Sequence, residues 1–228
     1  LVEKARDSES LLLQQSRIQS ELQEGLMSSR LVPFSRLVPR LQRVVRQTAT
    51  ELGKPVELNI LNAEGELDRS VLERMVAPLE HMLRNAVDHG MESPADRALH
   101  QKPEKGAITL PVLREGSEVI ITLQDDGRGI NVDAVRRKAI ERGIIEASAE
   151  LTDAEIMPLI FHAGLSTASQ VTQISGRGVG MDVVQSEIRQ LGGVVSVSSI
   201  AGQGTCFTLR LPLTVAVTDA LRVRLGDR

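Results

Sequence analysis

The chain has 228 residues, of which 41% are hydrophobic and 25% are charged, as is typical of a globular protein in water. Its net charge is −3, and it has three Phe but neither Trp nor Tyr, so it lacks both a basic field for nucleic acid and stacking platforms for single strands. The single cysteine, Cys206, excludes an internal disulfide and a cysteine-based zinc site, and it favours a reducing, cytoplasmic location.

The first segment, residues 1–30, predicts one long amphipathic helix. It lacks proline, it has no glycine before Gly25, and Leu or Ile recurs near helical spacing. Such a helix cannot bury its apolar stripe alone, so it needs a partner from another subunit or from a further segment. The start without Met and the abrupt end are those expected of a fragment. No apolar run approaches the roughly 18 residues of a membrane helix.

The remaining elements predict an α+β fold with helices against a mixed sheet. One strand precedes the long helix 67–90, and the other four strands form two hairpins, which is not a βαβ repeat. Pro78 predicts a kink or irregularity in that helix, and Gly90 predicts its end. The predicted strands are 56–60, 107–113, 118–124, 194–200 and 205–213, and the other predicted helices are 35–53, 131–143, 151–161 and 179–192.

The stretch DDGRGI, residues 125–130, links a strand to a helix and permits two interpretations. A Walker loop is absent and the Rossmann spacing fails, so a plain glycine turn is one interpretation. The other is a base-binding site, because a carboxylate accepts the hydrogen bonds that the adenine amine donates. Guanine would leave a buried Asp125 unpaired, at a cost of about 1–3 kcal/mol. Gly127 and Gly129 would then let the backbone approach the base.

A second glycine cluster, SGRGVGMDVV at 175–184, opens a helix. Gly176, Gly178 and Gly180 would let backbone N–H groups and the helix N-terminus meet an anion such as phosphate. A flexible joint is the alternative.

The helical segment HMLRNAVDHG, residues 81–90, places His81, Asn85, Asp88 and His89 on one face. The oxygen of an Asn is a hard ligand suited to Mg²⁺, which would neutralise a triphosphate. A solvated polar face is the alternative and is favoured for the histidines taken singly. A zinc site is less well supported, because the two histidines are eight positions apart without a third soft ligand.

Five segments in register resemble the N, G1, F and G2 boxes of the GHKL ATPases, and more narrowly the CheA-type histidine kinases of bacterial chemotaxis. The resemblance runs from about residue 25 to the C-terminus. It implies a two-layer α/β sandwich of the Bergerat type, with ATP under a lid spanning about 144–175. The segments are HMLRNAVDHG, DDGRGI, FHAGLSTAS (161–169), SGRGVGMDVV and GTCFTLRLPLT (204–214).

The same resemblance implies three parts. Residues 1–30 would be a partial dimerisation helix, residues 31–213 the ATP-binding kinase domain, and residues 214–228 the hinge and start of an SH3-like, CheW-like regulatory domain. LMSSRLVPFSRLVPRLQRVVRQTA (26–49) resembles the junction of the first two parts, and LPLTVAVTDALRVRLG (211–226) resembles the hinge.

Site roles also follow from the resemblance. Asn85 would bind Mg²⁺ and the phosphates with His81 as a second metal contact, and these two with His89 would form the catalytic group. Asp125 would read adenine, and Phe161 would anchor the lid. Ala134 stands where some relatives have a lysine. The residues implied to contact the nucleotide are Asn85, Asp88, His89, Asp125, Gly127, Gly129, Ile130, Lys138, Phe161, Ser166, Thr167, Gly176, Arg177, Gly178, Val179, Gly180, Met181 and Thr205.

The implied reaction transfers the γ-phosphoryl group of ATP to a histidine. No H-E-L-R-T-type acceptor is present, and His100 and His162 read as a helix end and a structural lid residue, so the acceptor is expected on a separate histidine phosphotransfer domain. The implied partners are a response regulator, a CheW-like adaptor, a chemoreceptor and a second copy in the full-length homodimer. The alternatives are another GHKL ATPase, which would carry a catalytic Glu where His81 stands, and a non-catalytic nucleotide-binding scaffold.

Overall fold

A five-stranded mixed sheet forms one layer of the fold. In the computed structural model, which describes residues 14–15, 18, 30–165 and 180–213, the strand order is β2-β4-β5-β7-β6. β2 pairs parallel with β4, and the other three pairs are antiparallel. This arrangement confirms the predicted α+β class with a mixed sheet. The strands are β2 (Val56–Leu61), β4 (Gly106–Glu115), β5 (Glu118–Asp125), β6 (Val194–Ile200) and β7 (Gly204–Pro212).

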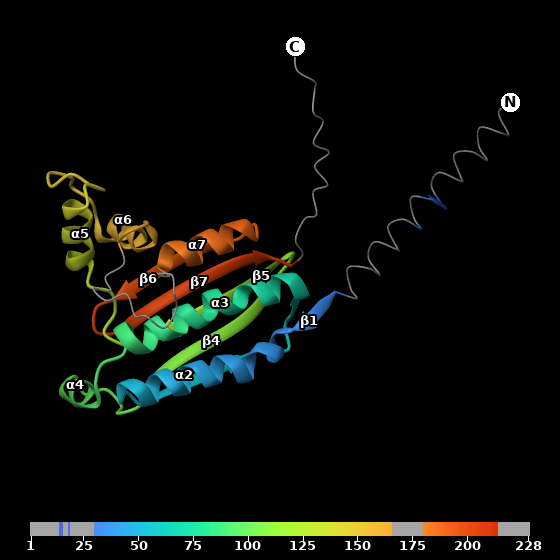
Figure 1. Cartoon of the computed structure of the whole chain (residues 1–228), viewed down its shortest axis with the longest axis horizontal. Helices are drawn as coiled ribbons and strands as arrows, with labels where there is room; N and C mark the ends of the chain where they lie inside the picture. The colour runs from blue at the N-terminus through green and yellow to red at the C-terminus, as the bar shows by residue number, and fades with distance from the viewer. Residues whose placement is uncertain (1–13, 16–17, 19–29, 166–179, 214–228) are drawn as a thin grey trace, which may run out of the picture.

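Three helices form the second layer. α2 (Val38–Leu52), α3 (Arg69–Asn85) and α7 (Met181–Gln190) lie side by side across one face of the sheet, with α3 in the middle (Figure 1). The face of α3 toward the sheet buries Leu, Met and Val side chains against alternate residues of the strands. This core holds the two layers together, because burying apolar area is the main favourable term in folding.

The ends of these helices agree with their sequence signals. Gly53 follows α2 in the left-handed conformation, with φ 62°, as predicted for a C-cap. α3 runs without interruption through Pro78, so the expected irregularity does not fall there. It falls at the C-terminal end, where a single π-helical turn, η2 (Ala86–Gly90), follows Asn85. Single π turns in helices occur frequently at functional sites.

Several short elements differ from the sequence predictions. β1 (Leu31–Pro33) and β3 (Glu66–Asp68) form a small antiparallel sheet, and strands of three residues are too short to show an alternating pattern. The helix predicted at 151–161 is instead the short α6 (Asp153–Ile156) followed by a 3-10 turn, η3 (Met157–Phe161). Pro158 stands at the start of η3 and disfavours a continuous α-helix. The other elements are η1 (Phe34–Leu37), α4 (Pro94–Leu99), whose C-cap His100 confirms the helix end predicted there, and α5 (Val132–Glu141).

Two predicted regions lie outside the described residues. In the helix predicted at 1–30, the structure describes Gln14, Gln15 and Ile18, which are helical and exposed. It also describes Arg30, at the end of the segment, which is an exposed turn residue. The segment 214–228 lies wholly outside them. Within the described part of the chain, no helix has both the length and the hydrophobicity needed to cross a bilayer.

The buried carboxylate of Asp68 joins the small sheet to the start of α3. Its Oδ1 accepts hydrogen bonds from the backbone N–H (2.8 Å) and hydroxyl of Ser70, and its Oδ2 lies 3.3 Å from Nε of Arg30. Burial opposes ionisation, but the bonds from Ser70 and the charge of Arg30 outweigh it and hold the pKa of Asp68 below its usual value. The ionised side chain therefore stabilises the fold as an N-cap.

We expect Asp68→Ala to lower the free energy of unfolding by about 2 kcal/mol at pH 7, because the cap and the ion pair are both lost. The effect is fully present above the ordinary aspartate pKa of about 3.9 and fades as the pH falls through the lower pKa of the folded state. Urea unfolding at several pH values measures it. Glu66→Ala, at an exposed position on the same strand, is the control, and equal effects of the two substitutions would contradict the assignment.

Candidate functional site

The end of η2 and the DDGRG turn are interlocked through their backbones. The N–H of Arg128 donates a 2.9 Å hydrogen bond to the carbonyl of Gly90. A Cβ at Gly127 would lie only 2.2 Å from that same carbonyl oxygen, so only glycine fits. The N box and the first glycine motif therefore form one unit, located where α3 and β5 both end.

Asp125 lies at the centre of this unit. It is the last residue of β5 and is 3% exposed. Its Oδ1 accepts hydrogen bonds from the backbone N–H groups of Gly127 (2.9 Å) and Thr205 (3.3 Å). Its Oδ2 has no hydrogen-bond donor within the described ranges. One oxygen is thus fixed by the protein, and the other remains able to accept a hydrogen bond.

Burial raises the pKa of Asp125 to about 6. The two backbone N–H donors lower it, and the nearby carboxylates of Asp126 and Glu92 raise it further. The carboxylate is therefore ionised at neutral pH but costly to keep so, which is a state that a hydrogen-bond donor on a ligand would relieve.

The turn between β6 and β7 packs against the same loop. A Cβ at Gly204, whose φ is +117°, would lie 1.9 Å from the carbonyl oxygen of Asp125, and one at Gly129, with φ +77°, would lie 2.6 Å from that of Ile200. The hydroxyl of Ser199 accepts from the N–H of Ile130 and donates to the carbonyl of Gly204, both at 2.8 Å. The backbone around Asp125 is thus held on both sides.

The two acidic residues of the motif have different surroundings. Asp126 pairs with Arg97, whose Nη2 lies 2.7 Å from Asp126 Oδ2. The backbone N–H of Ala107 donates to its other oxygen at 2.9 Å. The sequence reasoning missed Arg97, since its partner is 29 positions away and no local pattern links them.

Asn85, the last residue of α3, contacts two other predicted site residues. Its Nδ2 lies 3.0 Å from Nε2 of His81 and 3.5 Å from Sδ of Met181, the first residue of α7. Burial, together with the charges of Arg84 and His89, lowers the pKa of His81 although Asp182 opposes this. A neutral ring that accepts at Nε2 carries its proton on Nδ1 and fixes the amide.

This arrangement leaves Oδ1 of Asn85 as the free oxygen, a hard donor that fits Mg²⁺. His81 Nε2 is occupied by the amide, so His81 orients Asn85 and is not free at that atom as a ligand. The described residues contain no cluster of three or more His, Cys, Asp or Glu side chains able to hold a metal ion.

The π turn carries Asp88 and His89 at the rim of the unit. Both side chains are about half exposed, and Nε2 of His89 lies 3.7 Å from Oδ2 of Asp88. From the loop after α2, Nζ of Lys54 donates to the carbonyls of Val87 (3.2 Å) and Asp88. Lys54, which the sequence had not indicated, therefore caps the end of this turn, and burial lowers its pKa.

The remaining predicted residues lie in three places. Ile130 packs on a second apolar cluster built from α5, α6 and η3, and Lys138 lies on α5. Phe161 is buried at the end of η3, in edge-to-face contact with Phe207 at 6.2 Å between ring centroids. Gly180 is the N-cap of α7. The positions outside the described residues are Ser166, Thr167, Gly176, Arg177, Gly178 and Val179.

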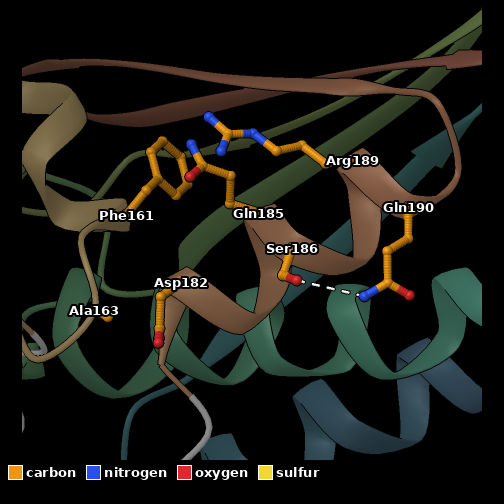
Figure 2. Close-up of a pocket in the computed structure, with 7 residues that line it drawn as sticks. All are labelled: Phe161, Ala163, Asp182, Gln185, Ser186, Arg189 and Gln190. Atoms are coloured by element: carbon orange, nitrogen blue, oxygen red, sulfur yellow. Dashed lines mark hydrogen bonds between the residues drawn. The ribbon is translucent and has the colours of Figure 1, made fainter.

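A cleft of about 500 Å³ lies on the outward side of α7 and does not include Asp125 or Asn85. Figure 2 shows Phe161 at one end and the polar side chains of α7 along its floor, with Ser186 bonded to Gln190. Asp182, near His81, lies at its edge. Cavity size alone would therefore not have identified the Asp125 unit. The lining residues are Phe161, Ala163, Asp182, Gln185, Ser186, Arg189 and Gln190.

The raised pKa of Asp125 has a measurable consequence for stability. Between about pH 4 and pH 6 the unfolded chain loses this proton before the folded chain does, so the contribution of Asp125 to stability falls as pH rises. Above about pH 6 the cost reaches about 3 kcal/mol. Without nucleotide, we expect Asp125→Asn to be more stable than wild type at pH 8 and to lose that advantage at pH 4.5. Urea unfolding at both values measures the gap, and a gap independent of pH would contradict it.

Known proteins share both the sequence and the fold. Residues 75–215 match the family described as "Histidine kinase-, DNA gyrase B-, and HSP90-like ATPase". The chain is 46% identical over 211 residues to the chemotaxis protein CheA of Treponema pallidum, covering 92% of the chain and 26% of that protein. It is 44% identical over 214 residues to CheA of Bacillus subtilis, covering 93% and 32%. It therefore spans about a quarter to a third of the length of these relatives.

The fold comparison agrees. The catalytic domain of histidine kinase ThkA superposes with a TM-score of 0.51 at 12% identity, covering 80% of this chain and 95% of that one. At this identity the likeness concerns the fold alone. The sequence match covers more than half of the chain and includes Asn85, Asp125 and the start of α7, and we conclude that the chain belongs to the histidine kinase-, DNA gyrase B- and HSP90-like ATPase family.

Proposed function

We propose that the chain is the ATP-binding core of a CheA-type histidine kinase, which transfers the γ-phosphoryl group of ATP to a histidine on a separate phosphotransfer domain. The observation that carries the proposal is Asp125, a buried carboxylate with one oxygen fixed by backbone N–H groups and the other free. An acceptor at this position selects adenine, whose exocyclic amine donates, over guanine, whose carbonyl would oppose it.

The phosphate end of the site is assigned to the group around Asn85. Its Oδ1 would hold Mg²⁺ together with the phosphates, and His81 keeps the amide in that orientation. The bound ion would supply charge neutralisation, which phosphoryl transfer needs more than covalent help. The resemblance adds His89 and Asp88 on the π turn, Lys138 on α5, and the glycines up to Gly180 as further contacts.

The surroundings of Glu80 favour transfer over hydrolysis. A water-activating carboxylate is expected one turn before Asn85, and that position holds His81. The neighbouring Glu80 is engaged by Arg40 of α2 through two hydrogen bonds, one of them 3.3 Å from Nη2 to Oε2. Glu80 is thus directed toward α2, on the side away from Met181. No carboxylate that could activate water stands at that helical position.

The described histidines also favour a separate acceptor. His100 ends α4 at an exposed position, with Nδ1 2.8 Å from the carbonyl of Asp96, and His162 is exposed beside Ala163. Among the described residues neither hydrogen-bonds with Asp125 or Asn85, which supports an acceptor on a separate domain. We also propose that residues 1–30 are a partial dimerisation helix, residues 31–213 the kinase domain, and residues 214–228 the hinge and start of a regulatory domain. The full-length protein is proposed to be a cytoplasmic homodimer. Its proposed partners are a response regulator, a CheW-like adaptor and a chemoreceptor.

The first test is nucleotide binding. With a fluorescent ATP analogue we expect saturable binding that tightens as pH rises through about 6, because the adenine amine needs the ionised form of Asp125. Asp125→Asn should weaken binding at least about tenfold and remove the preference for ATP over GTP. The lack of Trp and Tyr keeps background emission low. Glu64→Gln, an exposed charge between β2 and β3, is the control. A folded wild type that binds no nucleotide would refute the proposal.

The second test separates the metal from the base. We expect Asn85→Ala to abolish the enhancement of ATP binding by Mg²⁺ while leaving metal-free binding close to wild type, because Oδ1 serves the metal and Asp125 serves the base. Transfer of labelled phosphate to an added phosphotransfer domain should fall about 10- to 100-fold or more. Isothermal titration with and without Mg²⁺ and a gel assay measure the two effects.

The destination of the phosphate distinguishes the rival functions. Label on the acceptor histidine supports the kinase, and release of phosphate to water at a comparable rate supports a hydrolase of the same family. Tight binding of ATP with neither outcome would support a nucleotide-binding scaffold.

A further inference from the structure

Beside the DDGRG turn, four charged side chains form a largely buried cluster, which we call the charged clamp: Glu92, Arg97, Lys102 and Asp126. The side chains of Arg97, Glu92 and Lys102 are 1%, 6% and 15% exposed. Removing that many charges from water is costly, and apolar packing of equal volume often stabilises a fold as well or better. The charged clamp is therefore expected to have a role beyond stability, which its hydrogen bonds to the DDGRG turn indicate.

Arg97 binds two carboxylates with one guanidinium group. Nη1 lies 3.2 Å from Oε2 of Glu92, and Nη1 and Nη2 lie 3.2 Å and 2.7 Å from the two oxygens of Asp126. Nε donates to the carbonyl of Pro103 at 2.6 Å. This planar fork fixes the direction of the Asp126 side chain, and the N–H of Ala107 fixes it from the sheet.

Lys102 holds the backbone of the same turn. Its Nζ donates to Oε1 of Glu92 at 2.6 Å and to the carbonyls of Asp126 at 2.9 Å and Gly127 at 2.8 Å. The first of these carbonyls belongs to the peptide group whose N–H, on Gly127, donates to Oδ1 of Asp125. In a planar trans peptide the C=O and N–H point in opposite directions. Holding the oxygen at Lys102 therefore directs the N–H at Asp125.

We infer that Lys102 and Arg97 are positioning residues of the nucleotide site, which fix the 126–127 peptide group and thereby hold Asp125 with its free oxygen toward the base. The inference rests on the proposed role of Asp125 as the adenine acceptor. Neither residue is proposed to touch the ligand. Each acts through the turn, and a lysine on the peptide oxygen also strengthens the N–H as a donor.

The clamp also sets the charge around Asp125. The charged groups that act on Asp125 are Asp126, next to it in the chain, and Glu92, before α4. η2 and β7 contribute Gly90 and Thr205, which carry no charge. Both carboxylates disfavour ionisation of Asp125; Arg97 pairs with both of them, and Lys102 pairs with Glu92. Loss of a clamp cation therefore leaves Asp125 protonated to higher pH.

The experiment compares Lys102→Met with Lys105→Met. Lys105 is a matched control because it lies three positions on and pairs, more than half exposed, with Glu57 at 3.0 Å. We expect Lys102→Met to bind the fluorescent ATP analogue on the order of tenfold more weakly, to prefer ATP over GTP less, and to move the pH midpoint of binding upward. Lys105→Met should match the wild type in all three.

Lys102→Arg gives a second test if the Met variant folds poorly. It retains the cation and its donors, so the pH midpoint should return toward the wild-type value. Wild-type affinity, base preference and pH midpoint in a folded Lys102→Met would overturn the inference while leaving the proposed function intact. A folded wild type that fails to bind ATP would overturn both.

Discussion

The close approach of Gly90 to the DDGRG turn is the constraint on which the site depends. The carbonyl of Gly90 accepts from Arg128 and leaves no room for a side chain at Gly127. The helix reaches this position through the π turn that follows Asn85. Lys54 holds the carbonyls at the end of this turn. A short stretch of irregular helix thus joins the residues assigned to the metal with those assigned to the base.

The buried carboxylate of Asp125 lowers the stability of the folded chain at neutral pH. A carboxylate that is 3% exposed, with its pKa raised to about 6, destabilises the folded chain at neutral pH, and an amide of the same shape would not. Close packing at Gly204 and the N–H groups of Gly127 and Thr205 hold the surrounding backbone and keep the carboxylate in place. An unfavourable group held this firmly is expected of a binding site whose ligand supplies the missing donor.

Two ion pairs near the site have separate roles. The pair of Arg40 and Glu80 lies between α2 and α3 and engages the carboxylate next in sequence to His81. The pair of Arg97 and Asp126 lies in the DDGRG turn, which we propose binds the base, next to Asp125. The acidic pair that begins DDGRGI thus contains one residue free toward a ligand and one committed to the fold.

The sequence by itself determined the class of fold and the order of the long elements, whereas only the structure showed that Gly127 and Gly129 lie against neighbouring backbone carbonyls. Helical and alternating periodicities give these directly, and so do signals such as Gly53 at the end of α2. It did not reveal β1 and β3, the break at η3, Lys54 at the π turn, or Arg97 and Lys102 beside Asp126. Strands of three residues carry no period, and a pairing across 29 positions leaves no local pattern. Only the tertiary structure decided which of two adjacent aspartates is paired, because that depends on what lies on each side of the strand and not on the strand itself.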